Sequence, residues 1–338
     1  MGAAFLPPIG QVPRLHTDTR SARRRPGLPE CPTVGPLEKR ILFVTGKGGV
    51  GKTTVAFALG LAATADGKRT IVCEVASQEN ASRVFGRAEI GFHEVELRDN
   101  LYAISLDPDN ATREYLEQQL PVKAMGDLLY RSKIFSYLAA ATPGLREMVT
   151  IGKIWELALP ERRTKKASPY DLVIVDAPAT GHGIGLMQTP KNFAEIARVG
   201  PMAHQASLIN STITDHDQAG VVIVALPEEM PVNETATLEA ELIDAIGVSI
   251  DRIYMNAMYP DRFDSAEQTR LTGALPKAEG DVAAAIKAAI DESRRCESQR
   301  RQLERLRDLT RNEVETLPYV FTPELGIEHL SELAELVR

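Results

Sequence analysis

The sequence predicts an α/β protein with a mainly parallel sheet flanked by helices. Short, continuous apolar runs recur along the chain, as expected for strands that are buried on both faces. Stretches with helical character separate these runs, and strands that alternate with helices form parallel sheets covered on both faces. With 338 residues, of which 43% are hydrophobic and 25% charged, the chain is long enough to build one large domain with a full core.

The predicted elements follow in order from residue 40. A helix from Lys52 to about Asp66 follows the first strand, and Gly67 is placed to end it. A long, charge-rich helix is expected over residues 280–309, and an amphipathic helix closes the chain. The expected strands are residues 40–46, 69–75, 101–107, 170–178, 220–227, 250–258 and 317–323.

Two regions stand apart from this alternation. Residues 1–38 are rich in proline, glycine and arginine without any periodicity. Because such a composition cannot build a core, we predict a disordered tail there and a folded domain over residues 39–338. Within that domain, residues 109–166 have helical character with breaks at prolines, and we interpret them as a helical subregion added to the sheet.

The composition excludes several classes of protein. A net charge of −7 argues against nucleic acid as the main partner. No apolar run approaches the roughly 20 residues that span a bilayer, so we expect no integral membrane segment and a cytoplasmic location, with peripheral association left open. The cysteines Cys31, Cys73 and Cys296 form no C-x-x-C pair, which indicates free thiols rather than a zinc site or disulfides.

A phosphate-binding loop follows the first predicted strand. Residues 46–53 read G-K-G-G-V-G-K-T, which fits G-x-x-x-x-G-K-[ST] between a strand and a helix. Its glycines let backbone N–H groups surround phosphate oxygens, Lys52 can reach the β- and γ-phosphates, and the Thr53 hydroxyl can bind Mg²⁺. ATP and Mg²⁺ are therefore the predicted cofactors. The predicted nucleotide-binding residues are Gly46, Lys47, Gly48, Gly49, Val50, Gly51, Lys52, Thr53 and Thr54.

The loop carries a second lysine, Lys47, which makes it the variant form K-G-G-x-G-K-[ST]. This form resembles the loop of the MinD, ParA, nitrogenase iron protein and ArsA-type ATPases. The resemblance implies that Lys47 reaches across a dimer interface to the partner's nucleotide. A cation supplied in this way can stabilise charge on the transferred phosphoryl group, as an arginine finger does. Lys47 and Lys52 are accordingly predicted catalytic residues.

A second motif, "DAPATGHGIGLMQTP" at residues 176–190, narrows the resemblance to one branch. Its "TGH" and "LMQTP" are similar to the ArsA-type ATPases and the eukaryotic tail-anchored-protein targeting ATPases. The resemblance implies that Asp176 orders Mg²⁺ and takes part in catalysis, and Gly181 and Gly183 could let this segment move when the γ-phosphate leaves. It further implies that Asn256 reads the adenine and that Pro323 lies in the loop covering the base.

Taken over residues 40–338, these motifs identify the chain as resembling a single-domain, ArsA-like ATPase. The resemblance implies an ATP-binding, ATP-hydrolysing dimer, formed with an identical chain or a paralogous ATPase, that couples nucleotide state to a partner or client protein. The apolar segment at 128–141 within the helical subregion is a candidate client surface, with plain packing against the sheet as the alternative.

The chain departs from these relatives at the first switch segment. The alignment counted back from "VFG" at 84–86 places Ala76 where relatives have the aspartate that positions the attacking water. Alanine cannot orient water. Glu74 is the candidate catalytic replacement, with Glu79 as a second candidate. If neither residue acts, hydrolysis is expected to be slow.

Two other functions stay open. A MinD- or ParA-like positioning ATPase would need a basic amphipathic tail or a basic face, but residues 326–338 carry Glu328, Glu332 and Glu335. The arginines between residues 294 and 307 are interleaved with acidic residues. A weakly hydrolysing regulatory module is the other alternative, and Ala76 favours it.

Overall fold

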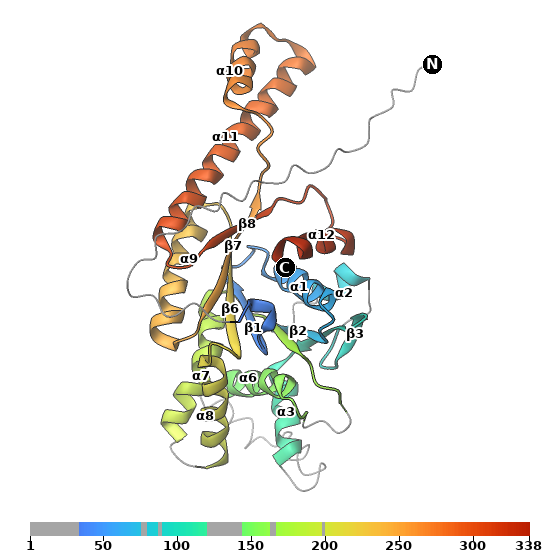
Figure 1. Cartoon of the computed structure of the whole chain (residues 1–338), viewed down its shortest axis with the longest axis vertical. Coiled ribbons are helices and arrows are strands. Elements are labelled where there is room, and N and C mark those ends of the chain that lie inside the picture. The colour runs from blue at the N-terminus through green and yellow to red at the C-terminus, as the bar shows by residue number, and fades with distance from the viewer. Residues whose placement is uncertain (1–33, 76–79, 87–89, 120–143, 163–166, 198–199) are drawn as a thin grey trace. The chain divides into compact units, whose positions relative to one another are not determined.

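The computed structural model describes residues 34–75, 80–86, 90–119, 144–162, 167–197 and 200–338, and these residues form one compact unit. They confirm the predicted fold class. An eight-stranded sheet has the order β3-β4-β2-β5-β1-β6-β7-β8 (Figure 1). All neighbouring strands are parallel except β3 and β4, which pair antiparallel at one edge.

The strands at the centre of the sheet are completely buried because helices cover both of its faces. The four central strands are β2 (Thr70–Val75), β5 (Leu172–Asp176), β1 (Ile41–Gly46) and β6 (Ala219–Ala225). The outer strands are β3 (Val95–Arg98), β4 (Leu101–Leu106), β7 (Ile250–Met258) and β8 (Val314–Pro318). Most of the eight strands are continuous apolar runs, which explains why the sequence pattern located most of them.

Alternate residues of each strand face two separate cores. In β1, Leu42 and Val44 pack with α1 (Lys52–Ala65) and α12 (Ile327–Val337) on one face. Ile41 and Phe43 face the other core. That second core includes residues of α6 (Leu145–Ala158), α7 (Thr180–Ala197), α8 (Pro201–Thr214), α9 (Glu229–Glu241) and α11 (Gly280–Leu309).

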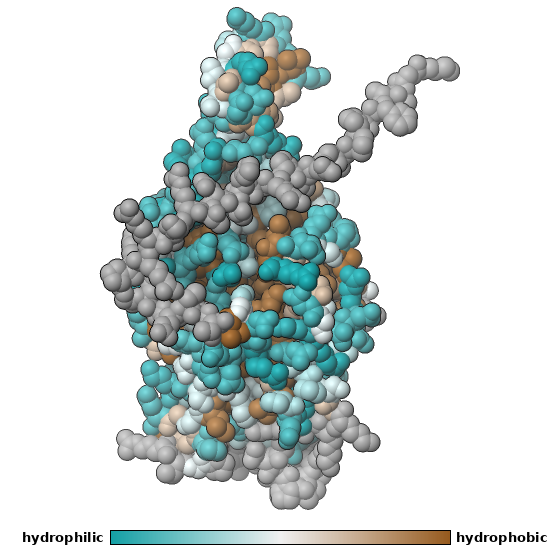
Figure 2. All heavy atoms as spheres, in the orientation of Figure 1, coloured by the Kyte–Doolittle hydropathy of each residue, from teal (hydrophilic) through white to brown (hydrophobic). Residues whose placement is uncertain are grey.

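Short elements complete the chain. They are the 3-10 turn Pro36–Glu38, α2 (Asn80–Phe85), α3 (Pro108–Gln119), the π-helical turn Leu242–Ile246, α10 (Ser265–Ala274) and the 3-10 turn Leu275–Lys277. Among the described helices, none is long and apolar enough to cross a membrane. Figure 2 shows apolar surface beside polar surface on α10 and the start of α11, where Val282 is exposed.

The structure differs from the expected elements at several places. The last strand spans Val314–Pro318 instead of 317–323. Beyond it, the Tyr319 ring stacks on Tyr259 and the Phe321 ring meets Tyr259 edge-on. The edge strand β3 and the helices α2 and α7 to α10 were not predicted individually. One of them, α7, contains Pro190, a residue that usually interrupts a helical pattern.

The two regions set apart by composition are only partly described. Residues 36–38, expected to belong to the tail, form a 3-10 turn in which Leu37 is buried. The rest of the predicted tail, residues 1–33, lies outside the described residues. The helical subregion contributes α3 and α6, whereas the candidate client segment at 128–141 lies outside the description.

Candidate nucleotide-binding site

The phosphate loop joins the end of β1 to the start of α1, as its motif predicts. Two of its glycines are required by close packing. A Cβ on Gly46 would lie 2.2 Å from the Val224 carbonyl oxygen, and one on Gly51 would lie 2.3 Å from Asn256 Nδ2. Both residues have positive φ, 145° and 94°, a backbone conformation that favours glycine. Any larger residue would displace the loop from the sheet.

The outer side of this loop is open. A Cβ on Gly48 or Gly49 would meet no atom within 4 Å, and both residues are exposed. Val50, by contrast, is buried and anchors the loop to the core. The loop therefore presents exposed backbone at the amino end of α1, where N–H groups and the helix dipole favour an anion such as phosphate.

Lys52, Thr53 and Asp176 meet at the base of the loop. Thr53 Oγ1 donates a hydrogen bond to Asp176 Oδ2 at 2.6 Å, and Lys52 Nζ donates to the Lys47 carbonyl oxygen at 2.9 Å. Burial lowers the pKa of Lys52, against the opposing charge of Asp176. Burial also raises the pKa of Asp176 to about 6, although Thr53 and Lys52 oppose this. A hydroxyl beside a carboxylate is a set of hard oxygen donors that fits Mg²⁺.

Glu74 lies on the strand next to Asp176. In the parallel pairing of β2 with β5, Glu74 is in register with Asp176, so both residues face the same side of the sheet. The Glu74 side chain is fully buried at the carboxyl end of β2. Its proximity to the site agrees with its candidacy, but its catalytic role stays a prediction. Ala76 and Glu79 lie outside the described residues.

Lys47 contacts α9 of its own chain. Its Nζ forms an ion pair with Glu234 Oε1 at 2.8 Å and lies 2.8 Å from Met230 Sδ. Neither partner is among the predicted site residues. They meet Lys47 because α9 follows β6, the neighbour of β1 that pairs with Gly46, and no local sequence pattern specifies this strand order.

The two residues expected around the base have different surroundings. Asn256 Nδ2 donates to the Val50 carbonyl oxygen at 2.9 Å, which brings the end of β7 to the phosphate loop. Pro323 is exposed in the chain after β8, where Thr322 Oγ1 donates to the Glu324 carbonyl oxygen at 2.7 Å. The contact of Pro323 with the base stays a prediction.

The second motif begins at Asp176, the last residue of β5, and its residues 180–190 form the first part of α7. A Cβ on Gly183 would lie 3.0 Å from the Pro178 carbonyl oxygen and 3.2 Å from Thr45 Oγ1. Gly183 therefore lets α7 start close against β1, directly after Asp176. Around Gly181 the space is open. The movement expected of this segment stays a prediction.

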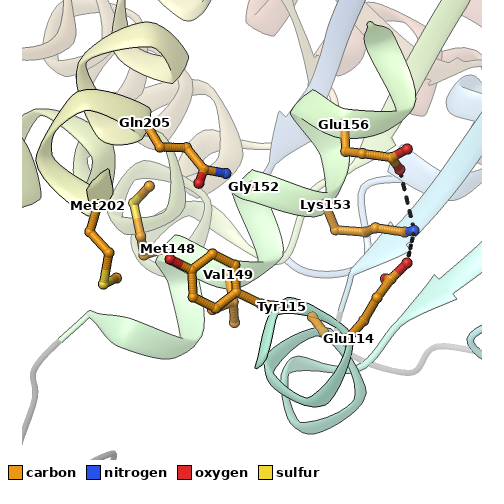
Figure 3. A pocket seen from close by; sticks show the side chains of 10 residues that line it. Glu114, Tyr115, Met148, Val149, Gly152, Lys153, Glu156, Met202 and Gln205 are labelled. Atoms are coloured by element: carbon orange, nitrogen blue, oxygen red, sulfur yellow. Dashed lines mark hydrogen bonds and ion pairs between the residues drawn. The ribbon is translucent and has the colours of Figure 1, made fainter. Parts of the chain in front are cut away.

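A separate cavity lies between α3, α6 and α8 (Figure 3), and none of its lining residues belongs to the phosphate loop. Lys153 of α6 lies there between two carboxylates, with its Nζ 2.8 Å from Glu114 Oε1 and 3.3 Å from Glu156 Oε2. The buried Arg162 side chain extends this network from Glu156 to Glu94. These ion pairs connect α3 and α6 to Glu94, the residue before the edge strand β3.

The parallel sheet, the glycine loop at the start of α1, and the Thr53–Asp176 pair together define a P-loop NTPase fold. Residues 39–200 match the family model of the anion-transporting ATPases. This match and the relatives described next support an ArsA-like ATPase.

Three relatives show the extent of the similarity. ATPase BagA of Mycobacterium tuberculosis is 28% identical over 249 residues, which cover 72% of this chain and 70% of that protein. ATPase GET3 of Kluyveromyces lactis is 26% identical over 267 residues, 68% of this chain and 75% of GET3. The arsenical pump-driving ATPase of Acidiphilium multivorum is 27% identical over 270 residues, 74% of this chain but 44% of the pump ATPase.

Proposed function

We propose that this protein binds MgATP in the loop of residues 46–54 and hydrolyses it. The single observation that carries the proposal is the Thr53–Asp176 hydrogen bond of 2.6 Å beside Lys52. Thr53 and Asp176 would hold Mg²⁺, directly or through water, and Lys52 would exchange its loop carbonyl for phosphate oxygens. The bound ion would neutralise negative charge on the phosphates. The loop backbone would orient the nucleotide, and Asn256 would face its base.

We further propose that nucleotide binding brings two protomers together, as identical chains or with a paralogous ATPase. Lys47 supports this step, because its loop form is typical of ATPases that act as dimers. In the dimer its ammonium group would contact the partner's nucleotide. The surface that the helical subregion, which includes α3 and α6, offers to a client protein would then change with nucleotide state.

Nucleotide binding and dimerisation are tested separately. Isothermal titration calorimetry with MgADP should show no measurable binding by Lys52→Ala, because the phosphates lose their main cation. Lys47→Ala should bind nearly normally but stay monomeric in sedimentation velocity with a non-hydrolysable ATP analogue. Lys191→Ala, on α7, is the matched control and should resemble wild type in both measurements. Unchanged affinity in Lys52→Ala would refute the proposed site.

Hydrolysis is expected to be slow unless a group replaces the aspartate missing at Ala76. Groups that orient or deprotonate water typically contribute on the order of 10²–10⁴ in rate. Single-turnover measurements should therefore show a faster Ala76→Asp variant. If Glu74 already holds the water, Glu74→Gln should slow turnover by a similar factor and Ala76→Asp should add little. Fast wild-type turnover that neither substitution alters would contradict both explanations.

A further inference from the structure

The Lys47 side chain is held in place within its own protomer. Its ammonium group contacts the Glu234 carboxylate at 2.8 Å and the Met230 sulfur at 2.8 Å. The Lys47 and Glu234 side chains are 32% and 39% exposed, so the pair is partly shielded from water. The two contacts leave Lys47 directed at α9.

The helix that supplies these contacts is firmly anchored. Val232 and Thr235 of α9 are buried on either side of Glu234 in the sequence. On the neighbouring α11, Arg305 donates a hydrogen bond to Asn233 Oδ1 at 2.7 Å. Because these other contacts hold α9 in place, breaking the Lys47–Glu234 ion pair should change the helix little.

Resting on the dimer proposed above, we propose that Glu234 is a positioning residue that retains Lys47 in cis and thereby raises the ATP concentration needed for dimerisation. The Lys47 ammonium cannot contact Glu234 and a partner's phosphates at the same time. Each protomer must therefore break the Lys47–Glu234 ion pair before it can complete its partner's site. The ion pair opposes premature dimerisation, and bound nucleotide in the partner supplies the competing negative charge.

The expected size of the effect follows from the exposure of the pair. Partly exposed ion pairs typically contribute 0.2–1 kcal/mol, and the upper part of this range, about 0.4–1 kcal/mol, corresponds to about a two- to fivefold effect per protomer. Because a dimer breaks two such pairs, the dimerisation constant should change by the square of this factor, about four- to 25-fold. Such a change is measurable without altering the fold.

The ion pair itself is tested first, in nucleotide-free protein. Limited acetylation by an activated ester, followed by peptide mass spectrometry, measures how accessible Lys47 is to reagent. Glu234→Gln should raise labelling of Lys47 about two- to fivefold, while Lys68 and Lys191 serve as internal references. Glu241→Gln, on the same helix, is the matched control and should leave Lys47 labelling unchanged. Equal labelling of Lys47 in all three proteins would overturn the proposal.

The consequence for assembly is tested by sedimentation velocity across a series of ATP-analogue concentrations. Glu234→Gln should dimerise at lower analogue concentration than wild type, with the affinity of the monomer for MgADP unchanged. An unchanged or higher midpoint would overturn the regulatory role. If no protein dimerises but Lys47 labelling still rises, the proposed dimer fails while the retention of Lys47 by Glu234 stands.

Discussion

Lys39 and Asp251 form a buried ion pair at the amino-terminal edge of the sheet, opposite the phosphate loop. Lys39 Nζ lies 3.2 Å from Asp251 Oδ1, and the side chains are 0% and 1% exposed. The same ammonium group donates to the His216 carbonyl oxygen. Gly220 makes room for this pair, because a Cβ there would lie 1.5 Å from Asp251 Oδ2. The charges therefore depend on each other for solvation.

Lys39→Met should destabilise the protein by about 3–5 kcal/mol at neutral pH, because it leaves the Asp251 carboxylate buried without its cation. Urea unfolding followed by circular dichroism measures the change. Lys68→Met removes a lysine from a more exposed pair with Glu38 and should cost less than about 1 kcal/mol. Similar losses in the two variants would contradict the importance of burial.

Asp251 should also give the protein a pH-dependent stability. Burial raises the pKa of Asp251 from 3.8 to about 6, although Lys39 opposes this. Between these two values the folded protein binds more protons at this site than the unfolded chain, so stability falls as pH rises. The free energy of unfolding of wild type, relative to Asp251→Asn, should decrease from pH 4 to pH 6 and then level off. A parallel pH profile in the two proteins would contradict this assignment.

At the scale of elements, one carboxylate fastens α9 to the connection between α11 and β8. Glu239 is 2% exposed. Its oxygens accept hydrogen bonds from the backbone N–H groups of Arg311 and Asn312, both at 2.9 Å, and from Asn312 Nδ2 at 2.8 Å. This carboxylate thus satisfies several donors at the end of α11. It links the helix that holds Lys47 to the strand that leads toward Pro323.

Glu239→Gln should destabilise the protein by about 1–3 kcal/mol, because an amide turns N–H donors toward the N–H groups that the carboxylate now satisfies. Chemical denaturation measures this loss of stability. The rate of amide hydrogen exchange should increase most at residues 311–314. Glu241→Gln, an exposed change on the same helix, should stay within about 0.5 kcal/mol of wild type. Equal stability of the two variants would show that the Glu239 contacts contribute little.

For the whole molecule, nucleotide should stabilise the folded state by mass action. At a MgADP concentration one hundred times the Kd, the expected gain is about 2.7 kcal/mol, measured as a rise in Tm. Asp176→Asn should lose the part of this gain that depends on Mg²⁺, because the carboxylate beside Thr53 is gone. Identical Tm shifts with Mg²⁺ and with a chelator in wild type would contradict a role for Thr53 and Asp176 as Mg²⁺ ligands.

Elements with strong local patterns could be predicted closely from the sequence. β7 and α11 begin and end at the predicted residues, because one is a continuous apolar run and the other a long helical stretch. β8 was placed too late, since the sequence alone cannot tell that the Tyr319 and Phe321 rings pack against Tyr259, one stacked and the other edge-on, beyond the end of the strand. Apolar character predicts that a residue packs against others, but the residues it packs against decide its backbone conformation.

The sequence by itself determined the P-loop fold and the phosphate loop. The strand, the glycines, Lys52 and Thr53 are consecutive, so local geometry brings their groups together. Tertiary structure alone decided that Lys47 meets Glu234 and that Asn256 meets Val50, pairs separated by 187 and 206 residues. The order of strands in the sheet brings these segments together, and that order depends on how distant apolar faces pack, which no local pattern specifies.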